Sequence, residues 1–167
     1  MAFVSQPAFA RLQRLLRSLM ALAVAVLLSV SVSACSGASK AAPTISPEDM
    51  ALITRQAEGF LSARDRLPEL SALVKDRNWV FTRNLIHGPM QEVNREMSYI
   101  NQRLLPADRA DANKRADKLK TALAQLDEAA RLQDGEGLRK AYIKVASGFG
   151  LYAQVFPPEV QEALKQV

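Results

Sequence analysis

Apolar residues recur along the chain at alternating steps of three and four residues, and they do so in four separate blocks. The blocks cover residues 50–74, 79–104, 112–130 and 138–156. Because an α-helix has about 3.6 residues per turn, this spacing places one apolar seam along each of four helices. Runs of alternating apolar and polar residues, which are typical of strands, are missing from these four blocks. The pattern therefore predicts an all-α protein.

The segments between the blocks carry residues that begin and end helices. Ser46-Pro47 predicts an N-cap with proline in the first turn, and Leu105-Pro106 separates the second block from the third. The stretch KDRN separates the first block from the second, and QDGEG separates the third from the fourth. Because all these connections are short, neighbouring helices are expected to run antiparallel. We expect an antiparallel up-and-down four-helix bundle over residues 46–156, followed by a C-terminal tail, 157–167, for which a short helix is one option.

Two prolines, Pro68 and Pro89, fall inside the helical pattern. Each removes one backbone hydrogen bond and clashes with the preceding turn, which costs about 3 kcal/mol in a helix interior. The apolar seam keeps its register through both prolines, so we interpret them as kinks and not as helix ends. They are expected at similar heights in the first hairpin, where they would produce a fixed curvature or a polar notch. Two tolerated kinks without functional meaning are the alternative.

The N-terminal segment has the features of an export signal. Three arginines and no acidic residue precede Cys35, and an apolar run of ten residues, LMALAVAVLL, follows the arginines. That run is shorter than the roughly 20 residues that span a bilayer. The sequence VSAC has the form of a lipobox, which predicts a lipoprotein signal peptide at 1–34 and a lipidated, flexible tether at 35–45. Cleavage after VSA by an ordinary signal peptidase, leaving Cys35 as an incidental thiol, is the alternative.

Charge and cysteine content narrow the class of protein further. The formal net charge of the whole chain is +5, but it falls to +2 without residues 1–34, because that segment carries three arginines and no acidic residue. Nucleic-acid binding therefore has little support and is not expected. Cys35 is the only cysteine, which excludes an intramolecular disulfide.

The sequence contains few residues that could do catalysis. His87 is the only histidine, so the paired Glu-x-x-His motifs of di-iron bundles are missing, and there is no haem-attachment motif or glycine-rich phosphate loop. We therefore expect no catalytic residues, metal, cofactor or small-molecule substrate. The competing hypothesis is an exported helical lipoprotein that carries a hydrophobic ligand or haem in its core.

Trp79, Arg83 and His87 lie on consecutive turns at the start of the second predicted helix. Trp and Arg are among the residues most often found as interface anchors. These three residues are therefore the candidate partner-binding site. In the alternative interpretation Trp79 fills the end of the bundle, Arg83 extends to solvent from a seam position, and His87 is a flanking residue with a satisfied hydrogen bond.

Four motifs follow the lipobox in a recognisable order: RQAEGFL, RDRLPEL, NWVFTRNLIHGP and LLP. Together they make residues 46–106 similar to the cyanobacterial PsbQ family, the lumenal lipoprotein subunit of photosystem II. The resemblance implies a four-helix bundle and a non-catalytic extrinsic subunit. It also implies that the subunit stabilises the oxygen-evolving complex by retaining calcium and chloride, and that it favours assembled complexes.

The same resemblance implies the location and the partners. It places the protein on the lumenal side of the cyanobacterial thylakoid membrane, attached through an acyl group such as palmitate on Cys35. The expected partners are the lumenal subunits of photosystem II, namely the other extrinsic proteins and the inner antenna.

Overall fold

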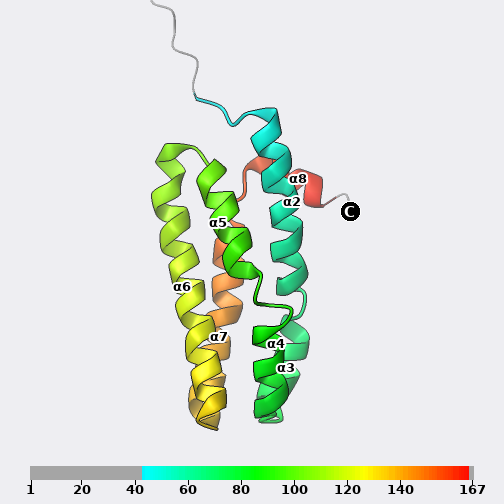
Figure 1. Cartoon of the computed structure of the whole chain (residues 1–167), viewed down its shortest axis with the longest axis vertical. Coiled ribbons are helices and arrows are strands. Elements are labelled where there is room, and N and C mark those ends of the chain that lie inside the picture. The colour runs from blue at the N-terminus through cyan, green and yellow to red at the C-terminus, as the bar shows by residue number, and fades with distance from the viewer. Residues whose placement is uncertain (1–42, 166–167) are drawn as a thin grey trace, which may run out of the picture. The chain divides into compact units, whose positions relative to one another are not determined.

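A computed structural model describes residues 43–165, and within this range it contains helices and no strand. The predicted all-α class is therefore confirmed for the described residues, whose packing is consistent with a helical bundle (Figure 1). The expected signal peptide and most of the expected tether, Cys35 included, lie outside the described residues. The helices are α2 Pro47–Arg64, α3 Leu67–Lys75, α4 Trp79–His87, α5 Val93–Arg103, α6 Pro106–Arg131, α7 Gly135–Ala153 and α8 Pro158–Leu164.

The start of α2 follows from its sequence. The Ser46 side chain accepts a hydrogen bond from the Asp49 backbone N–H at 3.1 Å, Pro47 stands in the first turn, and Glu48 and Asp49 place negative charge there. The predicted N-cap is thus confirmed. Ile45, the last residue of the expected tether, packs against the core.

The interpretation of the two prolines as kinks within continuous helices is wrong, because the structure ends a helix at each of them. α2 ends at Arg64 and α3 begins at Leu67, so Pro68 stands in the first turn of a new helix, where its missing N–H costs nothing. Pro89 lies between α4 and α5. Figure 1 shows both interruptions at about the same level of the molecule, as the sequence predicted for the two kinks.

The second interruption has a local cause besides proline. A Cβ atom on Gly88 would lie 2.8 Å from the Asn84 carbonyl oxygen, so only glycine fits there. The carbonyl of Leu85, which would lose its helical partner to Pro89, accepts instead from the Met90 N–H at 3.2 Å. The chain thus leaves α4 without stranding this backbone acceptor.

The helices pack in neighbouring pairs. α6 and α7 form the most extensive pair, α2 packs on α5, and α3 packs on α4 and α7, while α4 and α5 contact α6 (Figure 1). The predicted third and fourth helices thus appear as single helices, and the first and second each appear as two. α8 packs on α2 and buries Val160, which gives the C-terminal tail its place. None of the helices in residues 43–165 has the length and hydropathy needed to cross a membrane.

Four aromatic rings form the centre of the core. Phe60 of α2 lies 5.2 Å from Phe149, 4.9 Å from Tyr152 and 5.7 Å from Phe156, measured between ring centroids. The Tyr152 hydroxyl is buried and lies 2.8 Å from Asn101 Oδ1 and 3.1 Å from the Met97 carbonyl oxygen. Burial raises the pKa of Tyr152, so this hydroxyl stays protonated and can donate. Side chains of the predicted seams therefore fill the interior.

Candidate partner-binding site

The helix α4 carries all three residues of the predicted site. Asn78 caps it, accepting a hydrogen bond from the Phe81 N–H at 3.3 Å, and the spacing of four residues places Trp79, Arg83 and His87 along one side. The three side chains nevertheless have different surroundings in the structure. Trp79 is half-buried and packs against the core, whereas the Arg83 and His87 side chains are 41% and 60% exposed.

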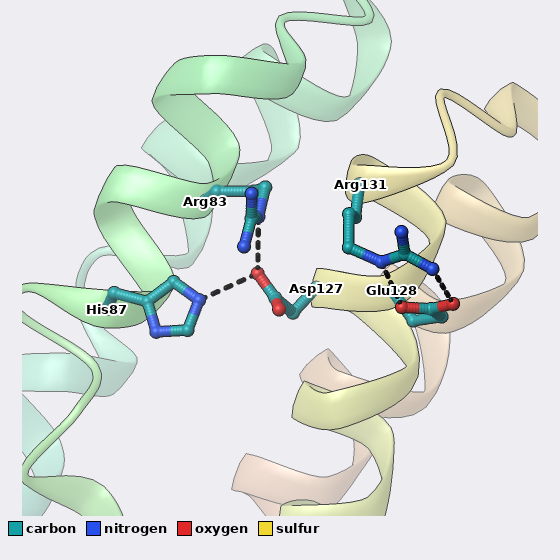
Figure 2. Close-up of polar contacts among 5 residues, drawn as sticks. All are labelled: Arg83, His87, Asp127, Glu128 and Arg131. Carbon is teal, nitrogen blue, oxygen red and sulfur yellow. Dashed lines mark hydrogen bonds and ion pairs between the residues drawn. The ribbon is translucent and has the colours of Figure 1, made fainter.

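Arg83 and His87 meet on a carboxylate of another helix. Figure 2 shows both side chains directed at Asp127 of α6. The Arg83 Nε donates to Asp127 Oδ1 at 3.0 Å, and the His87 Nε2 lies 2.8 Å from the same oxygen. Asp127 was not expected from the sequence, since it is 40 or more residues away and belongs to the polar flank of its own helix. No local motif could have identified it.

The electrostatics of this cluster favour the ionised carboxylate. Partial burial alone would raise the pKa of Asp127, but the hydrogen bonds from Arg83 and His87 outweigh it and hold that pKa below its ordinary value. Beside this cluster, Glu128 accepts two hydrogen bonds from the Arg131 guanidinium, at 2.6 and 2.7 Å (Figure 2). Positive and negative groups therefore alternate across the surface formed by α4 and α6. We call this surface, which carries Arg83, His87, Asp127, Glu128 and Arg131, the α4–α6 face.

The first turn of α4 exposes two large apolar side chains. Val80 is 66% and Phe81 is 60% exposed. Trp79 was the aromatic anchor expected from the sequence, but the nearby Phe81 is far more exposed in the structure. The signal was present in the pattern, because Val80 and Phe81 stand off the apolar seam. Within residues 43–165, no group of three or more His, Cys, Asp or Glu side chains is placed to hold a metal ion.

Replacing Asp127 by asparagine is expected to lower the free energy of unfolding by about 1 kcal/mol at neutral pH, since two partly exposed pairs are lost at about 0.2–1 kcal/mol each. A carboxyl group with a lowered pKa stabilises the fold above its unfolded-state pKa of about 3.9, and this contribution is lost as the pH falls through the folded-state value. Urea unfolding measured from pH 7 to pH 3 should therefore show the two proteins converging in acid.

Asp117→Asn is the matched control for this measurement. Asp117 lies on the same helix, is 74% exposed and is 3.6 Å from Lys120. Its replacement should change the free energy of unfolding by less than about 0.5 kcal/mol. An equal effect of the two substitutions, or a constant difference between Asp127→Asn and the unaltered protein at all pH values, would contradict the assignment.

Comparison with known proteins identifies the family. The model of the family described as PsbQ, oxygen evolving enhancer protein 3, matches residues 5–152. The chain is also similar to CyanoQ of Synechocystis sp. (strain ATCC 27184 / PCC 6803 / Kazusa), with 32% identity over 143 residues that cover 85% of this chain and 96% of the relative. The resemblance found in residues 46–106 is thereby confirmed over most of the sequence. The chain belongs to the PsbQ family.

Proposed function

We propose that this protein is a non-catalytic extrinsic subunit of photosystem II on the lumenal side of the thylakoid membrane. Its role in this proposal is to stabilise the oxygen-evolving complex, through retention of calcium and chloride, and to favour assembled complexes. The observation that carries the proposal is the match to the PsbQ family over residues 5–152, together with the identity to CyanoQ along nearly its whole length. PsbQ is a family of structural subunits and is not known for enzymatic activity.

The up-and-down four-helix arrangement is part of the proposal. Two of its four members would be the single helices α6 and α7. The other two would be interrupted helices, one made of α2 and α3 and the other of α4 and α5. A rigid body of this kind can bind a large partner by surface complementarity with little rearrangement. The filled aromatic core around Phe60 supports a structural role over transport of a ligand in the interior.

Lipidation of Cys35 is the second part of the proposal. Its support is the lipobox VSAC after a basic and apolar leader. An acyl chain contributes about 0.8 kcal/mol per buried methylene, so two or more chains give stable attachment. A short tether then keeps the folded body close to a membrane-bound partner and raises its effective concentration there. A modest docking surface would suffice.

We assign the docking contact to the α4–α6 face. Arg83 keeps 41% of its side chain exposed although Asp127 engages its Nε atom, so its outer N–H groups can donate to a partner carboxylate. Val80, one turn before Arg83, provides exposed apolar area on the same side of α4, and Phe81 exposes its ring farther round the helix. Arginine and aromatic residues, phenylalanine included, are enriched at protein–protein interfaces.

A pull-down through a C-terminal tag from detergent-solubilised thylakoid membranes tests the function. The unaltered protein is expected to recover oxygen-evolving photosystem II, and absence of these complexes from every preparation would overturn the proposal. The double variant Val80→Ser/Phe81→Ser should reduce recovery several-fold, because it removes apolar contact area without touching the core. Tyr99→Ser, which alters an exposed aromatic residue on α5, is the control and should recover as much as the unaltered protein.

A further inference from the structure

A second surface, on a different side of α6, has the form of a binding groove. It runs between α6 and α7 and has a volume of about 910 Å³. Small side chains and polar side chains form much of its lining, with two large apolar residues from α7. The lining residues on which the argument depends are Lys114, Lys118, Ala122, Ile143, Lys144 and Leu151.

The groove exists because the two helices approach closely at a glycine. A Cβ atom on Gly148 would lie 3.0 Å from Leu119 Cδ1 and 3.4 Å from Leu119 Cα, so the backbone of α7 lies almost against α6 there. Ile143 and Leu151, one turn and a half before and nearly one turn after Gly148, are 58% and 44% exposed. An apolar strip with a shallow floor is thus open to solvent along the helix pair.

Two hydrogen bonds hold the helices at this spacing. Arg115 Nη1 donates to the Leu151 carbonyl oxygen at 2.8 Å, and Lys144 Nζ donates to Gln125 Oε1 at 2.9 Å. They join α6 to α7 toward opposite ends of the groove. The surface is therefore formed in advance of any binding, which lowers the cost of ordering it.

The charge of the groove is positive. Lys114 and Lys118 lie one turn apart on α6, and Lys144 of α7 lies farther along the groove, beside Gln125. Asp117 is the one carboxylate among the lining residues. Asp117 is 3.6 Å from Lys120, outside the groove. Neither Lys114 nor Lys118 forms an ion pair with any of residues 43–165. Both lysines are exposed, so their ammonium groups are accessible to a partner.

We propose that this groove binds an acidic amphipathic helix of a partner protein within photosystem II, an inference that rests on the proposed function. The lining of α6 runs over 15 residue steps, or about 22 Å, which accommodates about four turns of a partner helix. Apolar residues of that helix would contact Ile143 and Leu151. Carboxylates one turn apart would meet Lys114 and Lys118. A helix that lays its apolar face into a groove on its partner is a common mode of recognition.

The test uses isolated photosystem II complexes depleted of this subunit and measures rebinding of the purified protein. The double variant Lys114→Glu/Lys118→Glu should weaken binding tenfold or more, since it places like charges opposite the partner's carboxylates. Lys75→Glu/Lys165→Glu has the same net charge and alters exposed residues of other segments, so it should bind within about twofold of the unaltered protein. Ile143→Gln tests the apolar contact separately and should weaken binding several-fold. Thermal unfolding of each variant establishes that the fold is kept.

A photoreactive residue at position 143 identifies the occupant. Crosslinking to a segment with two carboxylates about four residues apart, next to an apolar residue, would support the proposal. Crosslinks only to lipid or to a second copy of this chain would overturn it. Equal binding of the Lys114→Glu/Lys118→Glu variant and the unaltered protein would also overturn it while leaving the proposed function intact. Failure of the unaltered protein to rebind would contradict both the groove proposal and the proposed function.

Discussion

Replacing Phe60 by alanine is expected to lower the free energy of unfolding by about 3–5 kcal/mol, the largest stability effect of any single change considered for this protein. Phe60 is fully buried, and its ring contacts Phe149 and Tyr152 of α7 and Phe156 beyond that helix. Removing the ring leaves a cavity at the point where α2 meets the C-terminal part of the chain. The loss comprises both the transfer free energy of the ring and the unrelaxed cavity.

Phe81→Ala is the matched control for this prediction. It makes the same chemical change at a side chain that is 60% exposed, so it should alter the free energy of unfolding by less than about 0.5 kcal/mol. Urea unfolding followed by circular dichroism at 222 nm measures both variants. A loss below about 1 kcal/mol for Phe60→Ala would mean that the core around the ring is packed differently.

Replacing Cys35 by serine is expected to release most of the protein from the membrane. A serine hydroxyl cannot form the thioether that carries a diacylglyceryl group, so the acyl attachment proposed for Cys35 would be lost. No helix within residues 43–165 offers a membrane span in its place. After a carbonate wash, the unaltered protein should stay in the membrane fraction and the Cys35→Ser variant should appear in the supernatant or as an unattached precursor.

Ser36→Ala is the control, because it changes the neighbouring residue and leaves the thiol in place. It should remain in the washed membranes. Wash-resistant attachment of Cys35→Ser would disprove the lipid anchor. Mass spectrometry of the N-terminal peptide would then show at which residue the mature chain begins. Recovery of photosystem II by the Cys35→Ser variant at raised protein concentration would show that the tether acts through effective concentration.

The positions of the helices followed from local information. The steps of three and four residues predicted helical segments, and Ser46, Pro47 and Leu105-Pro106 marked boundaries that the structure keeps. The sequence indicated a disturbance of the helix at each of the two prolines, but we expected kinks where the structure has helix ends. An unbroken seam register does not distinguish a kinked helix from two helices that follow each other along one line. The close approach of Gly88 to the Asn84 carbonyl decides the second case, and it depends on backbone geometry.

Glu96 illustrates what the pattern could not predict. It lies on α5 between the seam residues Val93 and Met97, where the sequence indicates a solvated position, yet it is only 9% exposed. A Cβ atom on Gly59 of α2 would lie 3.2 Å from its carboxyl group. Burial raises the pKa of Glu96 despite the nearby Arg95. The missing side chain of a glycine on another helix provides the space.

The sequence by itself determined the helical class, the main helix boundaries and, through four ordered motifs, the PsbQ family. These depend on residues close together in the chain or on an ordered set of short motifs. Only the tertiary structure decided that Arg83 and His87 share Asp127, that Phe81 and not Trp79 is open to solvent, and that a basic groove lies between α6 and α7. The reason is that each of these depends on which faces of distant helices pack together, and periodicity places a face without naming its partner.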